Sequence, residues 1–203
     1  MEKRVSKKPG FSKWARSDYL AIMENSENLS KKLIRIAIVG PESTGKSTIS
    51  QQLALHYDTV WVPEYARGYC EKLVSECTWE DEINMFRGQL ELEEQMVSQA
   101  NRLLICDTTF ITVKIWSDHM FGRAPQEVLD KLPLHNYDLY LLMDIDLPWE
   151  EDPLRDFPHM REHFMEVWHK ELKALNATYR LISGSEEERL QNAIQAIGDY
   201  LSI

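Results

Sequence analysis

One eight-residue stretch constrains the fold of this chain more than any other feature of its sequence. Residues 40–47 read GPESTGKS and match the pattern GxxxxGK[ST] at every fixed position. The apolar, β-branched run over 33–39 predicts a buried strand before this stretch, and residues 46–57 predict a helix after it. A glycine-rich turn between a strand and a helix can enclose phosphate oxygens with its backbone N–H groups. We therefore expect residues 40–47, the phosphate loop, to bind phosphate.

Individual residues of the phosphate loop predict how ATP and Mg²⁺ bind. Gly40 and Gly45 permit backbone conformations that other residues disfavour, so that successive N–H groups can turn inward. Lys46 is expected to reach the β- and γ-phosphates, and the Ser47 hydroxyl to ligate Mg²⁺. A turn that binds nothing would not explain Lys46 and Ser47 together. The loop residues that we expect to contact ATP are Gly40, Glu42, Ser43, Thr44, Gly45, Lys46, Ser47 and Thr48.

Short apolar runs alternate with helical patterns along the rest of the chain. Further strands are predicted at 60–62, 103–106, 139–143 and 179–182, and helices at 78–100, 109–120, 125–131, 159–176 and 185–201. Thr78 with Asp81 and Ser185 with Glu188 form capping-box patterns before two of these helices. Because parallel strands need long crossover connections, the alternation predicts an α/β fold: a five-stranded parallel sheet with helices on both faces.

Composition bounds the compartment and the partners. The 203 residues are 43% hydrophobic, which suits one globular domain with a sizeable core. The three cysteines lack CxxC spacing and follow no signal peptide, so we expect reduced thiols and a cytoplasmic location. No apolar run reaches the roughly 18 residues of a membrane span. The net charge of −10 argues against nucleic acid as the main partner.

Residues 1–32 lie outside the alternation of strands and helices. They carry eight basic and four acidic residues, although the whole chain is acidic. Their helical pattern is limited to about residues 13–24. We expect an N-terminal basic extension over 1–32 and the alternating domain over 33–203. Such an extension suits a weak RNA or membrane-surface tether, or simply a solvated segment.

Two acidic residues follow predicted strands, where open parallel sheets bind their ligands. Asp107 comes directly after 103–106 and could hold a metal or a substrate, or could cap the next helix. Glu64 follows 60–62, and Arg67 comes three residues later. Glu64 and Arg67 could flank an acceptor, or could form an ordinary pair on a surface helix.

A proline-rich, charged segment over 146–158 follows the fourth predicted strand. Its Arg155, together with Arg161, could neutralise the charge of a phosphoryl group in transfer while the segment excludes water. The alternative is a solvated loop with incidental arginines. Ser183 and Gly184 end the last strand, where a backbone turn could border the adenine of ATP or serve only as a connection.

These motifs together resemble one family. The segments IAIVGPESTGKST, VPEYARGY, ICDTTF, DLPWEEDPLRD and LISG-x4-R, in this order, are similar to the ribosylnicotinamide kinase domain of NadR and its stand-alone bacterial relatives. The resemblance covers residues 33–201 and implies the P-loop NTPase fold of nucleoside kinases. It also implies phosphorylation of the 5′-hydroxyl of nicotinamide riboside by ATP, which yields nicotinamide mononucleotide. By position, Glu64 and Arg67 resemble acceptor-side residues, Asp107 the strand-end Asp, and Arg155 and Arg161 the lid arginines.

The chain departs from the family pattern at two places. Pro63 stands where NadR has an aromatic residue, and an expected Asp-Thr-Asp reads Asp107-Thr108-Thr109. If the family's aromatic side chain stacks on the acceptor, this chain needs another one. The candidates for that role are Trp61, Tyr65 and Trp149.

We therefore expect a small-molecule kinase that uses ATP and Mg²⁺. Ser47 and Asp107 would arrange the metal, and Glu64 or Asp107 would accept the proton of the acceptor hydroxyl. Nicotinamide riboside is the favoured acceptor. The alternatives are a kinase for another nucleoside or a thiamine-like molecule, and a nucleotide-dependent regulatory ATPase without an acceptor. A homo-oligomer is compatible with the sequence.

Overall fold

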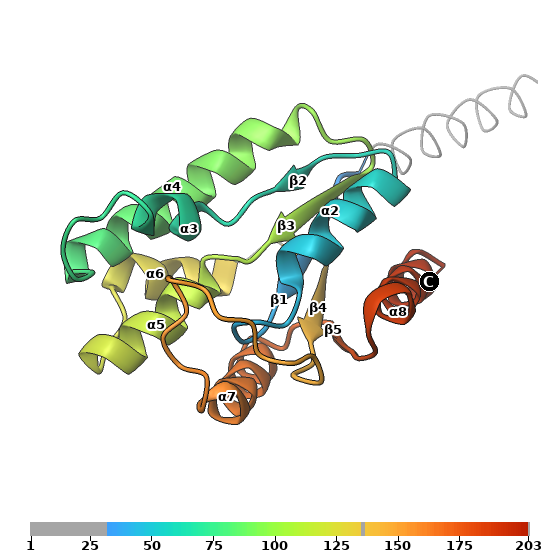
Figure 1. The fold of residues 1–203 in the computed structure, drawn as a ribbon. Helices are drawn as coiled ribbons and strands as arrows, with labels where there is room; N and C mark the ends of the chain where they lie inside the picture. The colour runs from blue at the N-terminus through green and yellow to red at the C-terminus, as the bar shows by residue number, and fades with distance from the viewer. Residues whose placement is uncertain (1–31, 135–136, 203) are drawn as a thin grey trace, which may run out of the picture. The chain divides into compact units, whose positions relative to one another are not determined.

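A five-stranded parallel sheet forms the centre of the structure, a computed structural model that describes residues 32–134 and 137–202 (Figure 1). The strands are β1 (Ile34–Val39), β2 (Trp61–Val62), β3 (Leu103–Asp107), β4 (Leu139–Met143) and β5 (Tyr179–Ile182). They lie in the order β2-β3-β1-β4-β5, and every neighbouring pair is parallel. The fold class predicted from the alternation is confirmed. The N-terminal extension expected over 1–32 falls almost wholly outside the described residues.

Helices cover both faces of this sheet. They are α2 (Lys46–His56), α3 (Tyr65–Cys70), α4 (Trp79–Val97), α5 (Ile111–Phe121), α6 (Gln126–Lys131), α7 (Arg161–Ala174) and α8 (Glu186–Leu201), with a short 3-10 helix η1 at Leu132–Leu134. Ile36 and Ile38 of β1 face α2 and α8, whereas Ala37 and Val39 face the other layer. The central strands β3 and β4 are buried along their whole length for this reason, whereas the edge strands β2 and β5 are partly exposed.

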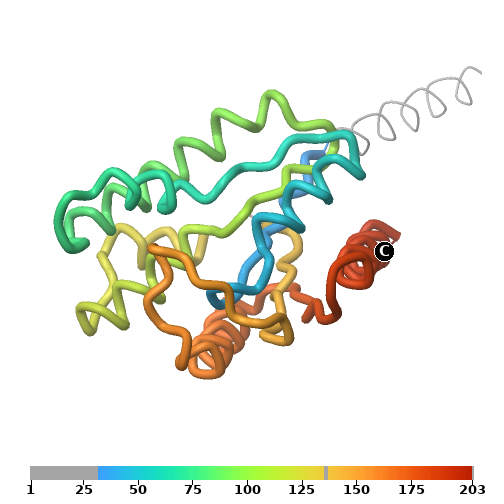
Figure 2. The backbone as a smooth tube through the Cα atoms, in the orientation of Figure 1, coloured from blue at the N-terminus to red at the C-terminus, as the bar shows by residue number. Residues whose placement is uncertain are grey.

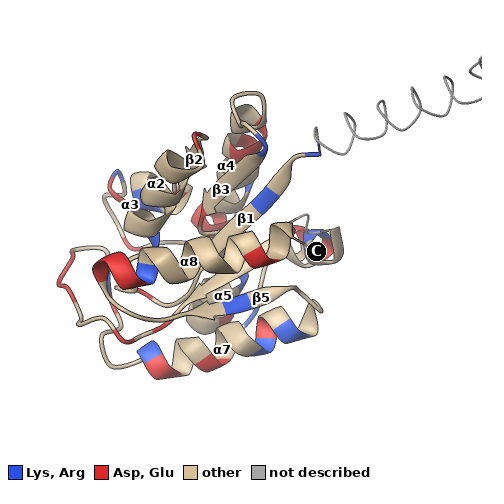
Figure 3. Ribbon diagram, turned by 90° about the vertical axis from the view of Figure 1, so that its right-hand side faces the viewer, with Lys and Arg blue, Asp and Glu red and all other residues tan. Residues whose placement is uncertain are grey.

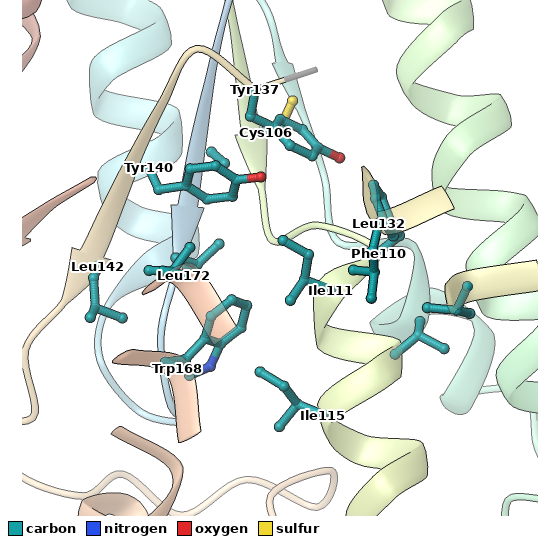
Figure 4. Packing of buried hydrophobic residues seen from close by; sticks show 14 of the residues in the cluster. Cys106, Phe110, Ile111, Ile115, Leu132, Tyr137, Tyr140, Leu142, Trp168 and Leu172 are labelled. Atoms are coloured by element: carbon teal, nitrogen blue, oxygen red, sulfur yellow. The ribbon is translucent and has the colours of Figure 1, made fainter. Parts of the chain in front are cut away.

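The larger core lies on the face that α4, α5 and α7 cover. Figure 4 shows Tyr140 and Leu142 of β4 beside Trp168 and Leu172 of α7, with Ile111 of α5 close by. All of these side chains are buried. A packed core of this kind holds the strand ends still, and the loops that follow them therefore start from fixed positions.

Local signals predicted some helix boundaries and missed others. The Thr78–Asp81 capping box at the start of α4 is confirmed. The box expected at Ser185 is wrong: Ser185 precedes α8 but makes no side-chain capping bond, and Glu186 after it has a positive φ of 45°. Acidic residues still fill the first turn of α8, where the helix dipole favours them (Figure 3). The short helix α3 was not predicted.

Parallel strands deliver their carboxyl ends to one edge of the sheet. The phosphate loop follows β1, Glu64 follows β2, and Asp107 ends β3. The segment 144–160, here called the lid, follows β4, and Ser183 and Gly184 follow β5. In Figure 2 the lid, in orange, runs beside the phosphate loop. The predicted site residues from all five strand ends therefore share this edge.

Candidate active site

The phosphate loop is a strained turn between β1 and α2. Gly40 has a φ of 139°, and a Cβ there would lie 2.9 Å from the carbonyl oxygen of Met143. Gly45 adopts the left-handed conformation, with a φ of 77°, directly before α2. Ser43 also has a positive φ, 55°, which is unfavourable for a residue other than glycine. Backbone strain of this kind collects at ligand-binding loops, where the surrounding structure enforces it.

Lys46 is folded back onto the phosphate loop. Its Nζ donates to the carbonyl oxygens of Gly40, at 3.1 Å, and Pro41, at 2.7 Å. Burial lowers the pKa of Lys46, while the nearby carboxyl groups of Glu64, Asp107 and Glu42 act in the opposite direction. The backbone carbonyls thus hold the Lys46 ammonium group where a bound phosphate could accept its hydrogen bonds instead. Thr48, two residues on, is exposed on α2.

Asp107 is positioned as the sequence predicts, at the end of the buried strand β3. It is 2% exposed, and its Oδ1 has no hydrogen-bond partner among the described residues. Burial raises its pKa to about 6, although a hydrogen bond from Ser47 acts to lower it. The residue before α5 is Phe110, so the alternative that Asp107 caps the next helix is wrong.

The pair Ser47 and Asp107 fits a magnesium ion. A hydroxyl and a carboxylate are hard oxygen donors, and one Asp oxygen lacks a partner. Mg²⁺ usually takes one or two protein ligands and completes its shell with phosphates and water. The described residues contain no group of three His, Cys, Asp or Glu side chains that could hold a metal alone.

Hydrogen bonds fasten the lid to the phosphate loop at Ser43. The Ser43 hydroxyl accepts from the backbone N–H of Glu150, at 2.8 Å, and from Arg155 Nη1, at 3.3 Å. Arg161 donates from Nη2 to the Ser43 carbonyl oxygen, at 3.1 Å, and from Nη1 to that of Leu147, at 2.8 Å. Both arginines predicted from the sequence therefore lie against the loop, and the alternative of a solvated segment with incidental arginines is wrong.

Glu64 and Arg67 lie at the start of α3 but do not form the surface pair that was the alternative. Glu64 is the N-cap residue of α3, and its side chain makes no capping bond. Its charge acts on Lys46 and Asp107, and also on Arg67, although Glu64 and Arg67 form no ion pair among the described contacts. Arg67 donates to Asp152 of the lid, at 2.9 Å. Helix α3 is thus tied to the lid.

Three aromatic residues were candidates for a ring that contacts the acceptor. Trp61 of β2 and Tyr65 of α3 are 37% and 36% exposed. Trp149 lies in the lid, half-buried, and its indole Nε1 is buried without a partner among the described residues. Of the three, Tyr65 directly follows Glu64 in the chain.

The edge near β4 and β5 is organised by Arg189 of α8, which is 2% exposed. Its guanidinium donates to the carbonyl oxygens of Thr44, at 3.1 Å, and Gly184, at 2.7 Å, and pairs with Asp146. The Ser183 hydroxyl donates to the carboxylate of Asp144, directly after β4, at 2.8 Å. Ser183 and Gly184 therefore belong to a turn that is fixed to the phosphate loop through Arg189.

Sequence reasoning missed three parts of this site. Asp152 was read only as part of a charged segment, and its partner Arg67 lies 85 residues away. Arg189 was noted only as the end of the LISG-x4-R pattern. Gly88 and Gln89 of α4, which contact Tyr65, were not singled out, although a glycine inside a helix is a recognisable signal.

Comparisons with known proteins agree with this architecture. A family model described as an AAA domain matches residues 35–189. The trifunctional NAD biosynthesis/regulator protein NadR of Salmonella typhimurium (strain LT2) is 29% identical over 126 residues, which cover 59% of this chain and 30% of NadR. This chain therefore corresponds to only part of NadR. Within the described residues, no helix is both long and apolar enough to cross a membrane.

Two solved structures of NadR have a similar fold. The complex of NadR with NR has a TM-score of 0.72 at 20% identity, and the match covers 93% of this chain and 59% of that one. The complex of NadR with NAD and AMP-PNP has a TM-score of 0.71, also at 20% identity, and covers 92% and 58%. At this identity the similarity establishes the P-loop fold of the present chain.

Proposed function

This chain belongs to the AAA-domain family, and from that premise we propose that it is an ATP-dependent kinase that phosphorylates nicotinamide riboside to nicotinamide mononucleotide. One observation carries the proposal: the phosphate loop, two carboxylates and two lid arginines meet at one edge of the sheet. A protein that only held Mg-ATP would use Asp107 for the metal but would not need the second carboxylate, Glu64, beside Lys46. The similarity to NadR, which has been solved with NR and with AMP-PNP, supports this choice of acceptor and donor.

The donor side binds and orients the triphosphate. The N–H groups of the phosphate loop and Lys46 would hold the β- and γ-phosphates, with Lys46 exchanging its carbonyl partners for phosphate oxygens. Ser47 and Asp107 would hold Mg²⁺, which would supply charge neutralisation to the triphosphate. Arg155 and Arg161 would stabilise the charge that spreads over the transferred group.

The phosphoryl group is transferred in a single displacement. The 5′-hydroxyl oxygen attacks the γ-phosphorus, the bond between that phosphorus and the β–γ bridging oxygen breaks, and ADP leaves. The hydroxyl proton passes to Glu64 or Asp107, although a base contributes little in a loose transition state. Asp107 would be occupied by the metal, so we favour Glu64.

The charge of the acceptor side supports nicotinamide riboside among nucleosides. Its pyridinium ring carries a fixed positive charge, whereas the rings of the common nucleosides are neutral. On α3 the Glu64 carboxylate makes no capping bond, and the positive charge of Arg67 is already balanced by Asp152 of the lid. A cationic acceptor is favoured in such a field.

The direct test is formation of nicotinamide mononucleotide by the purified protein with Mg-ATP and nicotinamide riboside. Lys46→Ala is the control, because it removes the cation without removing a core contact. An acceptor screen by ADP release distinguishes a kinase for another nucleoside or a thiamine-like molecule. Hydrolysis of ATP at a rate that no acceptor changes would instead favour a regulatory ATPase and overturn the proposal.

A further inference from the structure

Gly88, in the middle of α4, is a glycine whose backbone does not require one. A Cβ at this position would lie 2.1 Å from Cε1 and 2.2 Å from Cζ of Tyr65, far inside contact distance. The ring of Tyr65 therefore lies directly against the backbone of α4. A glycine inside a helix costs roughly 1 kcal/mol relative to alanine. Glycine occurs here despite that cost because any larger residue would clash with the ring of Tyr65.

The next residue, Gln89, fixes the backbone of Tyr65. Gln89 is 3% exposed, and its Oε1 accepts a hydrogen bond of 2.9 Å from the N–H of Tyr65. Glu64, at the N-cap position, does not bond the helix itself. Gln89 thus satisfies the N–H of Tyr65, one of the first N–H groups of α3, which have no partner within the helix, and the Glu64 carboxylate is not used for capping.

Gln89 is itself held by a buried chain of polar groups. Its Nε2 lies 3.5 Å from Glu93 Oε1, and the same Glu93 oxygen accepts a 2.6 Å hydrogen bond from the Tyr137 hydroxyl. Glu93 is buried, as is Tyr137. A side chain fixed in this way has little rotamer freedom, so it can position the residue that it contacts.

We propose that Gly88 and Gln89 are positioning residues of the acceptor subsite. Gly88 seats the ring of Tyr65 and Gln89 fixes its backbone, so together they set where Glu64 and the exposed part of the Tyr65 ring meet the acceptor. This inference rests on the proposed function, because it takes α3 as the acceptor side. It assigns the aromatic contact of a flat-ringed acceptor to Tyr65, because this chain has Pro63 where the family has an aromatic residue.

Gly88→Ala tests the contact of the Tyr65 ring with the backbone at Gly88, here called the seat, and Gly198→Ala is the matched control. Both glycines lie in helices, but a Cβ at Gly198 would meet nothing within 4 Å. We expect Gly88→Ala to raise the KM for nicotinamide riboside about tenfold or more, since small displacements of a positioned group are costly, and to leave the KM for ATP within about twofold. Gly198→Ala should change neither. An unchanged acceptor KM, or an equal rise in both KM values, would overturn the inference.

Rescue separates the seat from a general defect. In a Tyr65→Ala background the ring is gone, so Gly88→Ala should have no further effect on the acceptor KM. An undiminished effect in that background would contradict the contact. Gln89→Leu keeps the side-chain volume but removes the oxygen that accepts from the N–H of Tyr65. It should also raise the KM for nicotinamide riboside without raising the KM for ATP.

A double-mutant cycle on the thermal midpoint tests the contact between Gly88 and Tyr65 without any measurement of activity. Gly88→Ala should lower the thermal midpoint in the wild-type background and raise or leave it unchanged in the Tyr65→Ala background. This holds whether or not the protein turns over an acceptor. If the wild type phosphorylates nothing, the proposed function fails, and additive midpoint changes would show that the seat does not exist either.

Discussion

The two sides of the site bury ionisable groups of opposite kinds. On the phosphate side, made of the phosphate loop, the lid and Arg189, burial lowers the pKa of the cations Lys46, Arg161 and Arg189. On the acceptor side, made of α3 and α4, burial raises the pKa of Glu93, and that of Glu82 to about 7. One side costs stability by holding positive charges away from water, and the other by holding carboxyl groups there.

This difference explains how an acidic protein can bind an anionic nucleotide. The net charge of −10 opposes ATP at long range. Binding must come from local groups, and each buried cation of the phosphate side already has backbone carbonyl partners near the loop. Phosphate oxygens are stronger partners than carbonyls for these cations. The acceptor side needs no such groups, because a neutral or cationic acceptor is compatible with its carboxylates.

The largest effect is expected from Arg155→Ala, which breaks the phosphate side alone. An arginine supplied to phosphoryl transfer contributes roughly 10³-fold or more to kcat. We expect a loss of about that size in kcat, with much smaller changes in the KM for either substrate. Steady-state kinetics beside Arg180→Ala, an exposed arginine of β5 that bonds only the adjacent carbonyl among the described contacts, give the comparison. Equal activity of the two variants would mean that the lid takes no part in transfer.

Glu82→Gln tests how much the buried carboxyl groups of the acceptor side cost the protein in free energy of unfolding. The pKa of Glu82 is about 7 in the folded state, against 4.5 for its ordinary value. The folded protein therefore binds this proton more tightly than the unfolded chain does, so the stabilisation is complete below pH 4.5 and is lost as the pH rises through 7. The difference corresponds to about 3 kcal/mol at most. Glu82→Gln should be more stable than wild type at pH 8 by up to that amount.

Urea unfolding at several pH values measures this difference. The gain from Glu82→Gln should shrink as the pH falls from 8 to 5. The matched control is Glu94→Gln, on the exposed face of the same helix, which should show no such dependence. A gain that does not vary with pH would mean that burial does not shift the pKa of Glu82.

The smallest effect is expected where the two sides meet. Asp152→Asn removes the charge that Arg67 pairs with, and the pair is partly exposed, at 40% and 19% for the two side chains. Such partly exposed pairs contribute little to binding or stability, so the change should be about fivefold or less. We expect a rise of that order in the acceptor KM. In a double-mutant cycle with Arg67→Ala the effects should not add, and strict additivity would remove the link between α3 and the lid.

Local sequence patterns predicted the framework of the site but not its long-range contacts. The phosphate loop, the strand ends and Asp107 follow from runs of a few residues, because burial on both faces makes the central strands almost continuously apolar. Arg67 and Asp152 are 85 residues apart, and Arg189 and Thr44 are 145 apart. No local pattern encodes such pairs. The short helix α3 escaped for a related reason, since its buried partner at the first turn, Gln89, lies on another helix.

The measurement that tests the account most directly compares a cationic with a neutral acceptor. Purified protein with Mg-ATP is given nicotinamide riboside or uridine, and ADP and the phosphorylated product are both quantified. We predict equal amounts of ADP and nicotinamide mononucleotide, and a kcat/KM for nicotinamide riboside at least about tenfold above that for uridine, as carboxylates near a fixed positive charge require. Equal rates with both acceptors would contradict the acidic acceptor side. ADP without nicotinamide mononucleotide would contradict the kinase itself.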